Sequence, residues 1–449
     1  MRRLIHDEPT RLHLAAIAVL TVGGPCLLFP EVLPPSVRAL VVVSGTVAAL
    51  LLAIALTRND RPVTSLVSVL ALAAVVAWLA VPASPVALSH FAGFGFGLLA
   101  MSTVASWCRT ENRLAVAAAL FLLSGLTVLS VGLAASHYRV VGPHVRPRFF
   151  SVEFNNWLPY FELPLPGIIA GAGVNKNALG GTALLVLPVG ASLAFLRKRH
   201  RKQPFTAGVV VRSLGVCTAV VGTFVLLVSE SRSAWAAGWI TLVVLCSRTG
   251  SRWRSRALGF MILGTVSLMV VASLWVTDRS TFERARESTA ARGRIWQEGW
   301  EQLKSSRWVV GIGFNEFRRV SERRFDRDIV HAHNIFLQTA LDLGVIGLAA
   351  YGGLIGLLLY RSDQAARGRS GFLARTAAGA GLALVGVHGF GLGDAISLGA
   401  RVGLFQWLSS GLILATWRLQ HETSPTLTAV QACPATGVCP PPSPRGTTD

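Results

Sequence analysis

The sequence predicts an all-α integral membrane protein with about twelve transmembrane helices, and two observations support this. The chain is strongly apolar: its mean hydropathy is +0.53, 52% of its residues are hydrophobic and only 14% are charged. Apolar runs long enough to cross a bilayer also recur along most of the 449 residues. The expected spans are 12–30, 36–56, 63–82, 87–107, 114–135, 177–196, 207–228, 233–247, 257–277, 334–360, 372–391 and 398–418.

The net charge of +20 gives these spans an orientation. Basic residues gather in alternate connections, whereas a connection between them such as 83–86 carries none. The basic clusters lie at 2–11, 58–61, 109–113, 197–202, 248–256 and 361–369. This is the positive-inside pattern, which predicts that both termini are cytoplasmic. The same distribution explains the positive charge through topology and contact with anionic lipids, and it argues against nucleic-acid binding.

The spans and connections together predict six regions. They are N-terminal transmembrane helices at 1–135, an outer loop at 136–176, central transmembrane helices at 177–277, a larger outer loop at 278–332, C-terminal transmembrane helices at 333–420 and a disordered cytoplasmic tail at 421–449. In the larger loop, Ile295, Trp296, Trp300 and Leu303 recur at helical spacing among charged residues. This pattern predicts an amphipathic helix lying along the membrane surface.

Two arginine motifs on the predicted outer face are candidates for binding. In SESRSAW, Ser229 to Trp235, Arg232 stands between apolar runs, where an unpaired cation is costly. The plain alternative is an interfacial arginine or an ion pair with Glu230. In ARGRIWQEGW, Ala291 to Trp300, Arg292 and Arg294 precede the expected amphipathic helix, and the plain alternative is a solvated charged face.

Two further motifs carry ionisable groups at the same face. In HAHN, His331 to Asn334, a histidine lies where an apolar helix begins, although Asn334 as a helix cap beside two interfacial histidines is a simpler interpretation. The fourth motif is HGFGLGDAISLGARVGLFQW, from His388 to Trp407. We expect its Asp394 and Arg401 to pair with each other.

Taken together, these motifs predict chemistry on a phosphate-activated lipid. Guanidinium groups bind phosphate in a bidentate manner and keep their charge, so Arg232 with Arg292 or Arg294 suits a pyrophosphate. A helix N-terminus adds a second anion-binding element. A neutral His333 is then able to accept the proton of an acceptor hydroxyl.

Several stretches resemble the O-antigen ligase and O-antigen polymerase superfamily of bacterial envelope proteins. The resemblance covers mainly residues 165–410. It rests on GAGVNKNALGG (Gly171 to Gly181), SESRSAW, GRIWQEGWEQLKSSRWVVGIGFNEF (Gly293 to Phe317) and the string His333-Asn334, nine residues, Gly344, two residues, Gly347. Trp308 replaces a proline that is usual in the third stretch.

The resemblance implies a metal-independent, inverting glycosyltransferase with a helical membrane fold of the GT-C type. The donor is expected to be a glycan linked to undecaprenyl pyrophosphate, used at the periplasmic face of the inner membrane. By motif, Arg232 and Arg294 would bind the pyrophosphate, with Arg292 in reserve, and His333 would activate the acceptor. Asn334 would cap its helix and orient the site, and Asn177 joins the expected substrate-binding residues.

The resemblance implies no cofactor and no metal. The sequence agrees, because the nearest pair of carboxylates in the outer loops, Asp326 and Asp328, is expected to be solvated charge. The partners implied are membrane lipids, the lipid-linked glycan and either the lipid A core or a growing glycan. A ligase of lipopolysaccharide biosynthesis is favoured over a polymerase, which needs the same donor site. A transporter is the remaining alternative, although no buried charge pair marks a path through the membrane.

Overall fold

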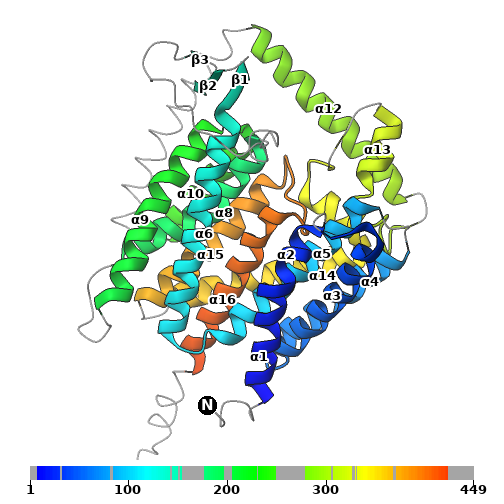
Figure 1. Cartoon of the computed structure of the whole chain (residues 1–449). Helices are drawn as coiled ribbons and strands as arrows, with labels where there is room; N and C mark the ends of the chain where they lie inside the picture. The colour runs from blue at the N-terminus through cyan, green and yellow to red at the C-terminus, as the bar shows by residue number, and fades with distance from the viewer. Residues whose placement is uncertain are drawn as a thin grey trace, which may run out of the picture.

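In a computed structural model the chain folds as a bundle of α-helices with a smaller layer at one end (Figure 1). The structure describes residues 8–30, 33–80, 84–141, 144–149, 152–153, 176–196, 205–229, 231–248, 279–304, 307–325, 329, 331–367 and 371–422. The helices in the first half are α1 (Glu8–Ala18), α2 (Gly24–Leu28), α3 (Pro35–Thr57), α4 (Arg61–Leu79), α5 (Pro85–Trp107), α6 (Glu111–His137), α8 (Lys176–Ala194) and α9 (Phe205–Val228). Those in the second half are α10 (Arg232–Arg248), α12 (Arg279–Lys304), α13 (Phe317–Phe325), α14 (Ile335–Ala366), α15 (Gly371–Phe390) and α16 (Leu404–Glu422).

Eight of these helices are long and apolar enough to cross a membrane, so the chain is a multi-pass α-helical membrane protein. They are α3, α4, α5, α6, α8, α9, α14 and α15. The expected spans at 12–30 and 233–247 correspond to shorter apolar helices, Arg11–Leu27 and Arg232–Ser247. The span at 398–418 begins later, as α16, and is not among the eight. The span expected at 257–277 lies outside the described residues, so the described part supports fewer spans than the expected twelve.

Several helices begin where the sequence places a capping residue. Asp60 precedes α4 and its side chain accepts from the backbone N–H of Val63 at 3.4 Å. Ser84 precedes α5 and accepts in the same way from Ala87 at 3.1 Å. In both helices a proline occupies one of the first two positions, where its missing N–H costs nothing.

The long helix α14 is bent at Gly344, where the backbone adopts φ 71°. A Cβ at this position would overlap the carbonyl oxygen of Val309, because the connection after α12 packs directly against the bend. The backbone N–H of Val345 donates to Trp308 at 2.8 Å, and that of Ile312 donates to Leu341 at 2.6 Å. Glycine at this position therefore allows a break in α14, where backbone groups of Leu341 and Val345 bond to the connection after α12.

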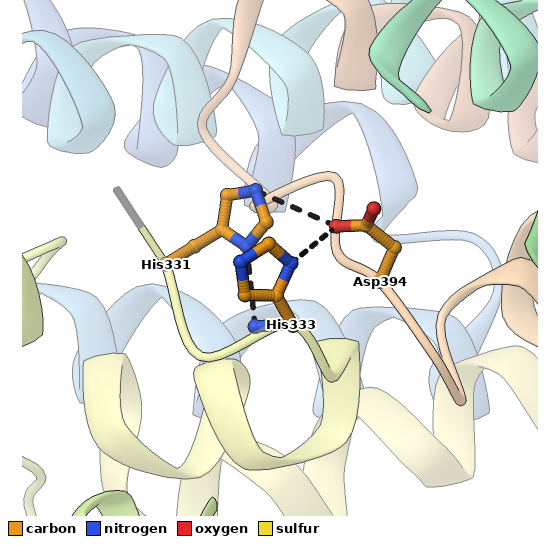
Figure 2. Close-up of side chains that lie close together, drawn as sticks. All are labelled: His331, His333 and Asp394. Atoms are coloured by element: carbon orange, nitrogen blue, oxygen red, sulfur yellow. Dashed lines mark hydrogen bonds and ion pairs between the residues drawn. The ribbon is translucent and has the colours of Figure 1, made fainter. Parts of the chain in front are cut away.

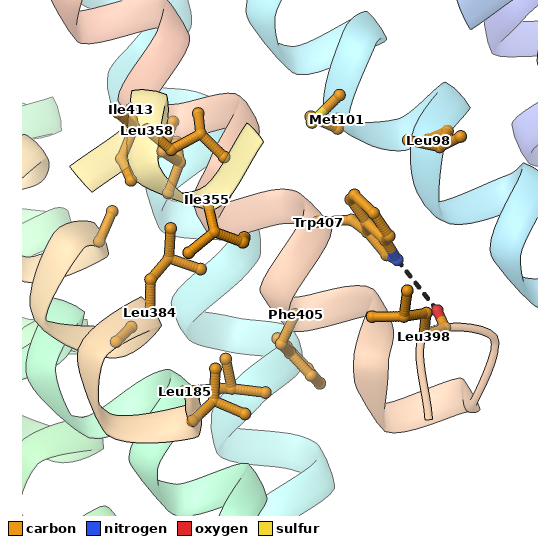
Figure 3. Packing of buried hydrophobic residues seen from close by; sticks show 14 of the residues in the cluster. Leu98, Met101, Leu185, Ile355, Leu358, Leu384, Leu398, Phe405, Trp407 and Ile413 are labelled. Atoms are coloured by element: carbon orange, nitrogen blue, oxygen red, sulfur yellow. Dashed lines mark hydrogen bonds between the residues drawn. The ribbon is translucent and has the colours of Figure 1, made fainter. Parts of the chain in front are cut away.

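The loop between α15 and α16 is fixed to the apolar core (Figure 3). Trp407 is fully buried and its Nε1 donates to the carbonyl oxygen of Leu398 at 3.0 Å. The ring packs edge-on against Phe94 of α5. A buried indole of this size contributes several kcal/mol through its contacts, and its hydrogen bond sets the position of the loop.

The two ends of the bundle differ in what covers them. Figure 1 shows α12, α13 and the strands at one end, and the start of α1 with the end of α16 at the other. The strands β1 (Tyr138–Val141), β2 (His144–Phe149) and β3 (Val152–Glu153) form an antiparallel sheet in that order. Helix α12 buries Ile295 and Leu303, whereas Trp296 and Trp300, expected on the same side, are partly exposed. The connection from α13 to α14 lies at the same end as α12 and α13 (Figure 1).

Candidate active site

The start of α14 is tied to the loop after α15. Asn334 is the N-cap of α14, and its Oδ1 accepts from the backbone N–H groups of Phe336 and Leu337, both at 3.0 Å. Its Nδ2 donates to the carbonyl oxygen of Leu392 at 3.3 Å, and the N–H of Ile335 donates to Gly391 at 2.8 Å. The capping expected from the sequence therefore also brings two distant segments together.

These contacts place Asp394 beside the two histidines of the HAHN motif (Figure 2). His333 Nδ1 lies 3.0 Å from Asp394 Oδ1, and His331 Nε2 lies 3.6 Å from the same oxygen. The side chain of Asp394 is only 2% exposed, compared with 26% for His333. His333 is thus the member of the cluster that a substrate can reach.

Asp394 is held as a carboxylate. Burial opposes its ionisation, but the hydrogen bond from His333, the electrostatic interaction with both imidazoles and the N–H of Ala395 together lower its pKa. The N–H of Ala395 donates to Oδ1 at 2.9 Å. An ionised carboxylate only accepts hydrogen bonds, so the Nδ1 of His333 carries the proton that they share. The Nε2 of a neutral His333 then has a free lone pair.

His331 has the opposite role of a neutral support. Burial, followed by the charges of His333 and Arg292, lowers its pKa to about 4 against the pull of Asp394. The backbone N–H of His333 donates to its Nδ1 at 3.2 Å, so its own proton lies on Nε2. His333 has φ 50°, an uncommon value for a residue other than glycine, and this contact helps to hold it.

The residue between the two histidines is fixed by a chain of hydrogen bonds. The N–H of Ala332 donates to Gln338 Oε1 at 2.8 Å, and Gln338 Nε2 donates to Asp342 Oδ1 at 2.8 Å. The same carboxylate oxygen accepts from the N–H of Asn315 at 2.9 Å. All four residues are buried. The first segment of α14 therefore fixes the backbone that carries both imidazoles.

The same three side chains could hold a metal ion. The ligand atoms of His331, His333 and Asp394 lie within 4.8 Å of one another. Two imidazoles and a carboxylate are suitable ligands for zinc and similar ions. In the hydrogen-bonded arrangement, however, the nitrogen atoms that face Asp394 carry protons, which a metal ion would have to displace.

Two of the expected arginines lie on α12, which packs against the first segment of α14. Gly299 of α12 lies against Leu337 and Leu341. Arg292 is half-buried, and its charge acts on His331, whereas Arg294 is exposed. Of the two arginines, Arg292 is therefore the one whose charge reaches the histidine cluster, and Arg294 is the more exposed.

The remaining expected residues lie on neighbouring helix ends. Arg232 is exposed at the first position of α10, and the next residue, Ser233, packs against Gly393, the neighbour of Asp394. Asn177 is half-buried at the start of α8, whose Gly181 packs against Ile396. Both helix ends therefore border the loop that carries Asp394.

An apolar pocket of about 780 Å³ adjoins the site. It lies between α12 and α14, and Asn334 and Phe336 line it next to the catalytic candidates. Trp296, Trp300 and Trp308 form much of its remaining wall. Lys304 is its cationic member and lies 5.4 Å from the Trp300 ring centroid.

The expected pairing of Asp394 with Arg401 is wrong. Asp394 bonds His333 instead, and the guanidinium of Arg401 stacks on Phe29 at 4.3 Å from the ring centroid. A signal for the true partner is present in the sequence, because the charge pattern puts Asp394 on the same face as His333. A catalytic histidine is often oriented by a carboxylate, and on this ground Asp394 could have been paired with His333 from the sequence. Asp326, Asp328 and Glu230 lie outside the described residues.

Comparison with known families bears on the same region. Residues 217–352 match the family model described as O-antigen ligase, which confirms the resemblance over this part of the chain. The matched segment includes Arg232, Arg292, Arg294, His333 and Asn334. It begins after Asn177 and ends before Asp394. No curated protein matches the chain.

Proposed function

From the match of residues 217–352 to the O-antigen ligase family, we propose that this protein is a glycosyltransferase of the bacterial inner membrane. It moves a glycan from undecaprenyl pyrophosphate to a hydroxyl of a lipid A core sugar at the periplasmic face. The observation that carries the proposal is the hydrogen bond of 3.0 Å between His333 Nδ1 and Asp394 Oδ1. It leaves His333 Nε2 as a base beside a helix N-terminus.

The base acts on the acceptor. A sugar hydroxyl is a weak acid, so its oxygen attacks the anomeric carbon well only as it loses its proton. Nε2 of His333 takes that proton while the new carbon–oxygen bond forms. The bond to the pyrophosphate oxygen breaks with inversion, and its electron pair leaves with undecaprenyl pyrophosphate. Asp394 remains ionised and stabilises the imidazolium.

The donor is held by charge at its pyrophosphate. Arg232 at the start of α10 and an arginine of α12 neutralise the leaving group, which therefore needs no acid. The effect of the Arg292 charge on His331 and the partial burial of Arg292 favour it over Arg294 for this role. Asn334 orients the start of α14, where the helix dipole favours an anion. Asn177 at the neighbouring end of α8 completes the proposed binding set.

The isoprenoid chain of the donor fits the apolar pocket between α12 and α14. The pocket begins at Asn334 and continues between tryptophan side chains, so a lipid within it brings its headgroup to His333. Aromatic rings of this kind are common at the membrane interface, where they contact lipid chains on one side and water on the other. Lys304 at the wall offers a cation to the phosphate end of a lipid.

The transfer needs no metal ion. The protons on His331 Nε2 and His333 Nδ1 both face Asp394, so these nitrogen atoms are not available to a metal ion. Arginines supply the positive charge that a divalent ion gives to other phosphate-transfer enzymes. Chelators should therefore leave the activity unchanged.

The full architecture proposed is a bundle of about twelve transmembrane helices of the GT-C type with both termini in the cytoplasm. The start of α1 and the end of α16 lie at one end of the bundle, which supports a common side for them (Figure 1). The outer loops at 136–176 and 278–332 would then be periplasmic. The six regions expected from the sequence follow from the same orientation.

The experiment is a transfer assay with purified protein, a glycan on undecaprenyl pyrophosphate and a lipid A core acceptor. A ligase extends the core and releases undecaprenyl pyrophosphate. A polymerase, which would use the same site, lengthens the lipid-linked glycan without the core. If neither product forms with the wild type while donor and acceptor are intact, the proposal is wrong.

Deletion of the gene gives an independent answer in cells. Loss of a ligase leaves core without long chains while lipid-linked polymer accumulates. Loss of a polymerase leaves single repeats attached to the core. Unchanged surface polysaccharide would contradict both activities and would favour another function, such as transport.

A further inference from the structure

A second pocket, of about 820 Å³, lies at the other end of α14. About 40 Å of helix separates Asn334 from Arg361, which lines this pocket. The other walls come from α1, the turn between α3 and α4, and the last turns of α5 and α16. Five of the lining residues are arginines and one is an aspartate. The pocket is therefore strongly basic and distinct from the proposed active site.

The aspartate is already matched. Both carboxylate oxygens of Asp60 bond the guanidinium of Arg361, and Arg361 Nη2 lies 2.9 Å from Oδ1. Arg361 is itself 5% exposed and stacks on Trp417 at 4.1 Å from the ring centroid. The remaining positive charge of the lining comes from Arg58, Arg61, Arg109 and Arg418.

Two of these arginines have guanidinium groups that the described structure uses little. Arg109 donates from Nε to the carbonyl oxygen of Ser106 at 3.4 Å. Arg61 forms no ion pair with any residue in the described part of the chain. Both are exposed. Like charges gathered in one pocket repel one another, and an anion bound between them removes that repulsion. Phosphate oxygens, like those of a carboxylate, bind a guanidinium in pairs.

The pocket also has an apolar part. Leu12, Leu56, Val63 and Leu414 line it together with the arginines. A free phosphate has no apolar part to pack against this surface, whereas the glycerol and first acyl carbons of a phospholipid do. Basic pockets between transmembrane helices at the cytoplasmic side are typical places for anionic lipid headgroups.

We propose that this pocket binds the phosphate of an anionic phospholipid from the cytoplasmic leaflet. Arg61 and Arg109 contact the phosphate from the α3–α4 turn and from the end of α5. The acyl chains lie along the leucine side chains of α1 and α16. The lipid thereby bridges helices from the first and last parts of the chain at the end opposite to the transfer chemistry.

The test is lipid binding by native mass spectrometry on the purified full-length chain, with thermal unfolding in detergent as a second readout. Phosphatidylglycerol should bind and raise the Tm, and phosphatidylcholine should not. In the variant Arg61→Gln/Arg109→Gln, phosphatidylglycerol should bind roughly 30-fold more weakly, since each arginine near the membrane surface contributes about fivefold. The variant Arg61→Lys/Arg109→Lys should bind with intermediate affinity, because it keeps charge but loses bidentate contacts.

The matched control is Arg113→Gln/Arg367→Gln, which removes two exposed arginines at the same end outside the pocket. Full binding by the control together with loss in the pocket variant supports the proposal. Equal loss in both would mean general attraction to charge and would overturn it. Inorganic phosphate raising the Tm as much as phosphatidylglycerol would also overturn it, because the pocket would then take a free anion. If the pocket variant fails to elute as a folded species, the lysine variant decides the result in the same assay.

Discussion

The two pockets have similar volumes, about 780 and 820 Å³, but they lie at opposite ends of α14 and have opposite linings. The first is walled by tryptophans and adjoins a histidine that one carboxylate orients. The second is walled by arginines whose charges act together. A proton transfer depends on single hydrogen bonds, whereas attraction to an anion depends on summed charge. One substitution should therefore disable the first end, and only combined substitutions should disable the second.

The largest effect is expected at His333. His333→Ala should reduce turnover by about 10²–10⁴-fold, because it removes the group that accepts the hydroxyl proton. Donor binding and the elution of the folded protein should not change. His331→Ala should reduce turnover much less, since His331 supports the backbone N–H of His333 and takes no proton. If turnover of purified His333→Ala is within twofold of the wild type, His333 is not the general base.

The next effect tests the carboxylate that sequence reasoning missed. Asp394→Asn should lower turnover by about 10²-fold, because an amide no longer holds the proton on His333 Nδ1. Asp394→Glu should recover part of the loss by restoring an acceptor. The measurement is the initial rate of transfer at saturating donor. If Asp394→Asn and Asp394→Glu are equally impaired, packing of the loop explains the loss instead.

The arginines should give intermediate effects on the donor. Arg232→Lys and Arg292→Lys should each raise the KM for donor by about tenfold, because an ammonium cannot contact two phosphate oxygens in the same way. Arg294→Lys should have a smaller effect, as its side chain is exposed further along α12. The KM for acceptor serves as the internal control. A larger effect at position 294 than at 292 would reverse this assignment.

A smaller effect is expected in the apolar pocket. Trp300→Ala should raise the KM for donor by about fivefold through lost contact with the lipid chain, while turnover at saturation stays the same. Leu120→Ala on α6 is a matched control, because Leu120 is an exposed apolar residue away from the pocket. An assay with a donor of shortened isoprenoid chain should show less difference between wild type and Trp300→Ala.

No effect is expected from chelation. EDTA should leave the rates of the wild type and of Asp394→Asn unchanged, because in the proposed mechanism arginine supplies the charge at the pyrophosphate. The comparison is made with and without added zinc at equal ionic strength. Loss of wild-type activity in EDTA that zinc restores would assign His331, His333 and Asp394 to a metal site.

The sequence predicts some of these features because their causes are local. Asn334 precedes an apolar run and is free to cap it, and the structure has it as the N-cap of α14. Hydropathy likewise predicts all eight of the described helices that are long and apolar enough to cross a membrane. Such features depend on neighbours in the chain, and a single sequence contains those neighbours.

Other features depend on contacts across the fold. Asp394 and His333 are 61 residues apart, and the nearest visible partner in the sequence was Arg401. The difference between Arg292 and Arg294 depends on how α12 packs against α14, which helical periodicity alone does not define. The break at Gly344 was hidden too, because a glycine within an apolar run is compatible with a continuous span.

The break at Gly344 divides α14 into two segments that are attached to different parts of the protein. The part of α14 after Gly344 is long enough to cross the membrane, at about 33 Å for 22 residues. A thinner or thicker bilayer changes the tilt of such a segment. The nine residues before Gly344 are bonded instead to the connection after α12, through Leu341 with Ile312 and through Asp342 with Asn315. We therefore expect a change in lipid chain length to alter the tilt of the segment after Gly344 more than the position of His333.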